Sequence, residues 1–310
     1  MRYETVKIFD AIEELTRVAR EAKIRAEVSH LKLSGPNAWG KADEVIAYLD
    51  KARAGGLEVT HDQYAYTASS TGLAQLIPDK AREGGHKKFL ERLDDPAQKS
   101  KIIADMKDAL KKGARTNYAY TVIASYKKDK SLNGKTIPEA ARLKRGSDSL
   151  ADQIELLLDI ERNGGGSGIF HGMSEPDLQK FLRHPLTMVA SDGGPRTLGE
   201  AVPHPRSYGN NARVLGRYVR ELKLLPLEDA IRKMTSLPAH TFRLKDRGEL
   251  KPGFVADLVI FDPDKVSDPA TFDQPHAYAV GFTDVVVNGT PVIRNGELTA
   301  TRPGRPVKLN

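Results

Sequence analysis

The sequence contains no cysteine, so neither a disulfide nor a thiolate metal site can form within this chain. None of its apolar stretches approaches the roughly 20 residues that a membrane-spanning helix needs. Residues 1–22 mix acidic and basic side chains at helical spacing and lack the continuous apolar segment of a secretory signal. These absences predict a cytoplasmic protein that does not enter a membrane.

Several catalytic signatures are also missing from the 310 residues, namely His-Glu-x-x-His, Gly-x-Ser-x-Gly and the P-loop lysine motif. Lysine and arginine number 48 against 41 acidic residues, which gives a formal net charge of +7. The excess lies largely between Lys80 and Arg145, with a spacing typical of solvated helix faces. Because no helix-turn-helix pattern or alternation of aromatic and basic residues accompanies it, we expect no nucleic-acid partner.

Strands and helices alternate in the first part of the chain. Apolar residues recur at helical spacing over 4–22, and a short strand is predicted over 24–30. A second helix over 42–54 ends at a pair of glycines, and a second strand follows over 57–61. A strand, a helix and a strand within about 38 residues make a βαβ unit, which predicts a parallel sheet and an α/β fold.

The middle of the chain contributes further helices, and the end changes character. Helices are predicted over 94–113 and 147–162, a capping box starts another at Ser174, and strands are predicted over 118–124, 168–171 and 186–191. After about residue 246 the sequence consists of short β-branched strands with Asn-Gly turns. We therefore predict a βα portion over 1–246, with a helical insertion at about 78–165, and a small β module over 247–310.

Four polar residues fall at the carboxyl ends of predicted strands: His30, His61, His171 and Asp192. In a βα barrel, side chains at these ends converge on one mouth. Imidazole and carboxylate groups bind zinc, and a carboxylate beside a zinc-bound water can act as a general base. The positions of His30 and His61 on successive strands favour a pair of metal ligands, whereas His171 could equally line the pocket and Asp192 could cap the next segment.

Two further stretches offer groups that could bind a substrate. Arg206 follows His204 in a proline-rich loop, where it could form a two-pronged contact with a carboxylate or a surface salt bridge. Tyr64 opens a hydroxyl-rich stretch over 64–71, which could line the same pocket or pack as an ordinary loop.

The chain resembles the amidohydrolase superfamily and, within it, the N-acyl-D-amino-acid deacylases, or D-aminoacylases. The C-terminal stretches are typical of the β module that many amidohydrolases carry, and the earlier ones are specific to the deacylase branch. The resemblance extends over nearly the whole chain and rests on residues 28–32 with 37–41, 61–71, 191–193 with 204–206, 247–262 and 286–289.

This resemblance implies a zinc-dependent hydrolysis that releases a carboxylate and a free D-amino acid from an N-acyl-D-amino acid. It implies that His30 and His61 are zinc ligands on the fifth and sixth strands of a TIM-type barrel of the metal-dependent hydrolase kind. Asp192, after the eighth strand, is the implied general base, and Arg206 the residue that holds the substrate's α-carboxylate. Tyr64 is a possible neighbour of Arg206, and His171 and His204 are expected to line the site.

The sequence departs from the family pattern at its start, because the first four strands and their His-x-His motif are missing. We therefore expect a fragment, or one half of a split enzyme that needs a second chain for the remaining strands. Two alternatives stay open. One is a cyclic-amide hydrolase of the dihydropyrimidinase or dihydroorotase kind, and the other is a non-catalytic binding or assembly subunit.

Overall fold

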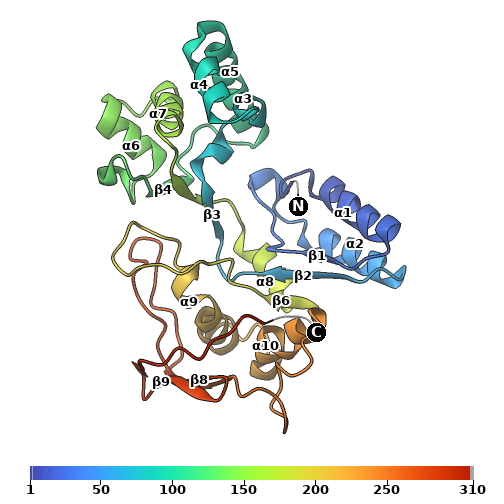
Figure 1. Ribbon diagram of the computed structural model, residues 1–310. Coiled ribbons are helices and arrows are strands. Elements are labelled where there is room, and N and C mark those ends of the chain that lie inside the picture. The colour runs from blue at the N-terminus through green and yellow to red at the C-terminus, as the bar shows by residue number, and fades with distance from the viewer. Residues whose placement is uncertain (2, 308–310) are drawn as a thin grey trace.

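A three-stranded parallel sheet occupies the centre of the computed structural model, which describes residues 1 and 3–307 (Figure 1). Its strands are β1 (Ala26–Val28), β2 (Val59–Gln63) and β6 (Thr187–Val189), in the order β1-β2-β6. His61 lies opposite Val28 on one side and opposite Thr187 on the other. The predicted βαβ unit and its parallel pairing are confirmed.

Helices α1 (Ile8–Ala22), α2 (Ala42–Ala54) and α8 (Glu175–Arg183) accompany this sheet. The buried residues of α1 recur three or four positions apart, and Lys23 ends the helix in a left-handed conformation. Apolar side chains of the three helices and of β1 and β2 share one core, which includes Ile8, Ile12, Val28, Val45, Leu49, Val59 and Phe181. One face of the sheet is therefore sealed by helices.

A second, antiparallel sheet contains β3 (Ala68–Gly72), β5 (Ser167–His171) and β4 (Thr121–Ser125), in the order β3-β5-β4. The expectation that the strand ending at His171 belongs to the same parallel sheet as His30 is wrong, because β5 pairs only with β3 and β4. His171 therefore does not share a strand end with His30.

The segment between β3 and β5 is largely helical and forms the lobe at the top of Figure 1. Its own core includes Phe89, Met106, Tyr118 and Ile154. The helices are α3 (Asp79–Arg82), α4 (His86–Asp94), α5 (Pro96–Lys112), α6 (Ile137–Arg145) and α7 (Leu150–Arg162). Two short 3₁₀ turns, Leu73–Leu76 and Lys130–Leu132, belong to the same segment, and a third, Pro36–Ala38, lies earlier in the chain.

Helices and then an antiparallel sheet complete the chain. The helices are α9 (Arg206–Arg213), which continues as a π-helix over Val214–Glu221, then α10 (Leu227–Met234) and α11 (Ser236–Thr241). The strands, in the order β10-β9-β8-β7, are β7 (Leu258–Phe261), β8 (Phe282–Val287), β9 (Thr290–Arg294) and β10 (Glu297–Leu298). Both Asn-Gly pairs have positive φ at both positions, as predicted for hairpin turns.

The parallel sheet is not closed into a barrel. Within residues 1 and 3–307, the outer edges of β1 and β6 pair with no further strand. The architecture shown is therefore an α/β fold. In the same residues, no helix is both long enough and apolar enough to cross a membrane.

Candidate functional site

His30 and Asp192 follow strands of the parallel sheet, as predicted. His30 comes two residues after β1, and Asp192 comes three residues after β6. Both have positive φ, +47° and +48°, a conformation that few residues with a side chain adopt. The backbone N–H of His30 donates to Oδ1 of Asp62 at 2.6 Å, which fixes the turn after β1 from the neighbouring strand.

Glu4 and Lys32 surround one nitrogen of His30. Nδ1 of His30 lies 3.0 Å from Oε1 of Glu4 and 2.8 Å from Nζ of Lys32, and the same Glu4 oxygen accepts from Lys32 at 2.6 Å. Burial by itself would raise the pKa of Glu4, but the hydrogen bond from His30 and the nearby ammonium group hold it below its ordinary value. Burial lowers the pKa of Lys32, and the charge of Glu4 opposes that shift. Nδ1 of His30 is thus engaged, while Nε2 has no partner among the residues described.

Arg206 forms the second half of the site. Its Nη2 lies 2.9 Å from Oδ2 of Asp192 and donates to the carbonyl oxygen of Ser70 at 3.4 Å. The guanidinium stands 4.6 Å above the ring of Tyr64, and the ammonium of Lys32 lies 5.7 Å from the same ring. Tyr64 therefore joins the two halves, and burial raises the pKa of its hydroxyl.

We call Glu4, His30, Lys32, Tyr64, Asp192 and Arg206 the rim cluster. Arg206 is only 6% exposed, yet its Nη1 has no hydrogen-bond partner in the described part of the chain. The side chain of Asp192, in contrast, is 41% exposed. The cluster thus offers a buried, incompletely paired guanidinium beside an accessible carboxylate.

His204 supports Arg206 from behind. The backbone N–H of Arg206 donates to Nδ1 of His204 at 3.0 Å, so the ring proton sits on Nε2 and is donated to the carbonyl oxygen of Ala68 at 2.9 Å. Burial, and then the charge of Arg206, lower the pKa of His204 to about 3, so the ring is neutral. The rings of His204 and His171 both pack against Phe272, at 5.0 and 4.7 Å between centroids.

The structure does not bring His61 into the rim cluster with His30. Arg53 Nη2 donates to its Nδ1 at 2.7 Å, and its Nε2 donates to the Thr187 hydroxyl at 2.7 Å, which in turn donates to the carbonyl oxygen of Phe181 on α8. Strand β2 continues to Gln63, so His61 is interior to it, and side-chain alternation along the strand directs it to the helix-covered face. The ring is fully buried, and burial lowers its pKa well below the ordinary value.

The described residues do not assemble a complete metal site. No group of three or more histidine, aspartate and glutamate side chains in them could hold a metal ion. A catalytic zinc usually has three protein ligands and a water. Nε2 of His30 has no partner in the described part of the chain, but Asp192 is engaged by Arg206 and His61 is enclosed on the other face.

Several polar residues of this region were not predicted. Glu4 and Lys32 are in the rim cluster, and Asp62 holds the backbone of His30. Glu27 accepts a hydrogen bond from Thr60, and burial and the nearby carboxylate of Asp62 raise its pKa to about 7. Charged residues within or just after short apolar strands were the available signal for Glu27 and Lys32, whereas no local pattern marks Glu4.

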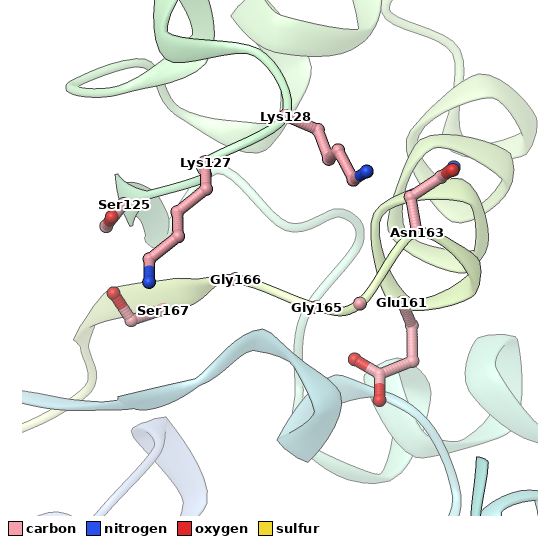
Figure 2. A pocket seen from close by; sticks show the side chains of 9 residues that line it. Ser125, Lys127, Lys128, Glu161, Asn163, Gly165, Gly166 and Ser167 are labelled. Carbon is pink, nitrogen blue, oxygen red and sulfur yellow. The ribbon is translucent and has the colours of Figure 1, made fainter.

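Two cavities outside the rim cluster have cationic linings. A groove of about 680 Å³ borders the rim cluster at Glu4 and contains Arg115. A separate cavity of about 540 Å³ lies beside the glycine-rich turn before β5, where Figure 2 shows Lys127 and Lys128 across from Glu161. That turn enters a strand and not a helix, so it lacks the helix N-terminus of a phosphate-binding loop.

Comparison with known proteins identifies the class to which this fold and site belong. Residues 130–293, more than half of the chain, match the amidohydrolase family, and the chain belongs to that family. The D-aminoacylase of Alcaligenes xylosoxydans xylosoxydans is 34% identical over 305 residues, which are 98% of this chain and 53% of that relative. The N-acyl-D-glutamate deacylase of the same organism is also 34% identical, over 98% of this chain and 52% of its own length.

Solved structures agree with these relatives. A crystal structure of D-aminoacylase superposes with a TM-score of 0.77 at 33% identity, covering 98% of this chain and 54% of that one. The N-acyl-D-glutamate deacylase of Bordetella bronchiseptica, solved with zinc and a phosphonate inhibitor, gives a TM-score of 0.76 at 32% identity, covering 98% and 54%. The resemblance to N-acyl-D-amino-acid deacylases is thereby confirmed. The chain spans about half the length of the relatives it matches.

Proposed function

We propose that this chain provides the substrate-binding and proton-transfer half of an enzyme that hydrolyses N-acyl-D-amino acids to a carboxylate and a free D-amino acid. The similarity to two curated deacylases covers 98% of the chain. The bond broken in this reaction is a linear amide.

The proposal depends chiefly on Arg206. The guanidinium is 6% exposed, and its buried Nη1 has no hydrogen-bond partner among the residues described, so it can pair with an anionic group that is not part of this chain. A carboxylate matches the two-pronged geometry of the guanidinium, and every N-acyl amino acid has an α-carboxylate. The ring of Tyr64 beneath the guanidinium, and His204 behind its backbone, keep the side chain in place.

Asp192 is the proposed general base. Its exposed carboxylate stands beside the guanidinium, so a bound α-carboxylate places the scissile amide near it. Asp192 then accepts the proton of the attacking water and returns it to the leaving amine.

His30 is the residue of this chain that we propose as a metal ligand. A relative was solved with zinc, and we propose a divalent cation, zinc by preference, for the complete enzyme. From this chain His30 contributes Nε2, and Glu4 at its Nδ1 resembles the carboxylate partner that commonly orients a metal-binding histidine. The described residues bring no group of three ligands together, so we propose that the rest of the enzyme completes the metal site.

We further propose that β1, β2 and β6 are part of a TIM-type barrel whose other strands are supplied by a second polypeptide. The outer edge of β1 pairs with no strand of the described chain. Beside it, a groove of about 460 Å³ is lined mainly by apolar residues of α1 and β1 and by Ile24, whose side chain is exposed. An open strand edge next to apolar surface is suited to receive another strand and helix.

The experiment is a hydrolysis assay on N-acetyl-D-amino acids, with the L-enantiomers as controls. The chain is assayed alone and co-expressed with the part of the A. xylosoxydans D-aminoacylase that lies outside its match to this chain. We expect zinc-dependent turnover of D-substrates only in the co-expressed sample. Arg206→Met should raise KM about 100-fold. Arg206→Lys should not restore KM, because lysine lacks the two-pronged geometry of the guanidinium. Lys128→Met removes one positive charge elsewhere and is the control.

Other outcomes would contradict the proposal. Turnover of ring amides in preference to N-acetyl-D-amino acids would indicate a cyclic-amide hydrolase. A stable, metal-free complex that hydrolyses neither substrate class would indicate an assembly subunit.

A further inference from the structure

A loop of residues 190–205, which we call the Asp192 loop, connects β6 to α9 and contains no helix or strand. Asp192 lies near its start, and Arg206, with which Asp192 forms an ion pair, follows its end. Among the residues described, Arg206 alone pairs with the carboxylate of Asp192, and that side chain is 41% exposed. The position of the carboxylate therefore depends on what holds the loop.

His276 contacts the Asp192 loop through both nitrogens of its ring. The backbone N–H of Gly199 donates to Nδ1 at 3.1 Å, and Nε2 donates to the carbonyl oxygen of Ala201 at 2.9 Å. A neutral imidazole with its proton on Nε2 makes both hydrogen bonds at once. His276 belongs to the connection between β7 and β8, over 262–281, which Figure 1 shows in orange beside the loop in yellow.

The same ring also contacts α9. The hydroxyl of Tyr208 donates to Nδ1 of His276 at 3.0 Å, and the two rings meet edge to face with 5.9 Å between their centroids. Tyr208 is two residues after Arg206, in the first turn of α9. His276 therefore joins the middle of the Asp192 loop to the helix that begins with Arg206.

The two partners of the ion pair are held to different degrees. Arg206 is 6% exposed, its guanidinium lies over the ring of Tyr64, and its backbone N–H donates to His204. Beyond the ion pair, residues 192–198 make no hydrogen bond to another element in the part of the chain that the structure describes. The contacts of His276 are thus the first that fix the loop after Asp192.

We propose that His276 is a positioning residue, which holds the loop that carries the general base Asp192 against the helix that begins with Arg206. The inference rests on the proposed function, because it takes Asp192 as the general base. A displacement of about 1 Å at a reacting group can slow a reaction by about 100-fold. Because Arg206 has its own supports, loss of His276 should lower kcat and leave binding of the α-carboxylate nearly intact.

The first measurement is hydrogen exchange of the full 310-residue chain, followed by mass spectrometry on peptides from 193–203. His276→Phe keeps an aromatic ring beside Tyr208 and removes both hydrogen bonds to the loop. We expect exchange in these peptides to become at least about fivefold faster, the equivalent of one hydrogen bond. His276→Gln keeps one acceptor and one donor and should recover part of the protection. His86→Phe, at an exposed histidine of α4, is the matched control and should leave the exchange unchanged.

The second measurement is the kinetics of the co-expressed enzyme on N-acetyl-D-amino acids. We expect His276→Phe to lower kcat at least about tenfold and to change KM less than about twofold. His276→Gln should restore part of kcat, and His86→Phe should alter neither constant. A substitution that only weakened the fold would lower the amount of active enzyme and would not be relieved by the glutamine variant.

The outcomes separate this inference from the proposed function. Unchanged exchange in His276→Phe would overturn the inference, whatever the co-expressed enzyme hydrolyses. Faster exchange with an unchanged kcat, or a rise in KM as large as the fall in kcat, would also overturn it. Faster exchange in a chain whose unaltered co-expressed form hydrolyses no N-acyl-D-amino acid would support the hold on the loop and refute the proposed function. Circular dichroism of His276→Phe must match that of the unaltered chain, and His276→Gln supplies the comparison if it does not.

Discussion

Replacing His61 by alanine should destabilise the fold, because the structure places this histidine among the supports of the sheet. The change removes the acceptor of Arg53 and the donor to Thr187, both in a fully buried environment. Each lost hydrogen bond costs about 1 kcal/mol, and the cavity left by the ring adds about 1–3 kcal/mol. We expect the free energy of unfolding to fall by about 3–5 kcal/mol.

The assay is urea unfolding at pH 7.5 with a chelator present, so that no metal contributes to stability. His30→Ala is the control, because the side chain of His30 is 32% exposed and this variant should lose less than about 1.5 kcal/mol. His61→Gln, which keeps one donor and one acceptor, should recover part of the loss. If His61→Ala unfolds like the unaltered chain under these conditions, while the co-expressed enzyme loses zinc, His61 is a metal ligand and the placement described here is wrong.

Three further predictions concern buried titratable groups and one close backbone approach. His204 stays neutral down to about pH 3 in the folded chain, whereas in the unfolded chain it binds a proton below about pH 6.5. The free energy of unfolding should therefore fall by about 2 kcal/mol between pH 7 and pH 5. His204→Asn should remove this pH dependence, and unfolding curves at pH 7, 6 and 5 check it. Glu27 changes stability with pH in the opposite direction, because its raised pKa of about 7 means that the folded chain loses stability as the pH rises from the unfolded-chain pKa through 7. Glu27→Gln should therefore stabilise the chain at pH 8 by up to about 3 kcal/mol and leave its stability at pH 4 unchanged. A variant that is destabilised at pH 8 would contradict this. A Cβ on Gly281 would lie 2.5 Å from the backbone of Val266, whereas a Cβ on Gly253, which has a similar positive φ, would meet open space. Gly281→Ala should therefore lower the free energy of unfolding by more than about 3 kcal/mol, and Gly253→Ala by about 1 kcal/mol. Thermal unfolding of the two variants measures the difference.

Local features of the fold followed from the sequence. The amphipathic helix over 4–22 and the βαβ unit depend on side chains three or four positions apart and on a glycine stop, which act within one element. The Asn-Gly hairpins depend on two residues each. His30 and Asp192 lie close behind predicted strand ends, and in a parallel sheet such ends meet at one edge, so their approach to a common rim could be predicted as well.

Strand ends and strand partners could not be predicted with the same certainty. Strand β2 runs two residues beyond His61, so a histidine expected at its end lies within it and faces the helices. Because successive side chains point to opposite faces, a shift of one residue reverses the face of a strand side chain, and apolar periodicity does not locate a strand end that closely. Similarly, nothing local distinguishes a strand that joins the parallel sheet from one that, like β5, joins an antiparallel sheet beside it.

The sequence by itself determined the βαβ unit and several other helices and strands, the deacylase resemblance, and the candidacy of His30, Asp192 and Arg206. Only the tertiary structure decided which charges meet. Glu4 reaches His30 from 26 positions away, and Arg115 lines a groove built from residues far apart in the chain. Hydrogen bonds and ion pairs act over a few ångströms, so their partners are set by the packing of whole elements and not by the order of residues.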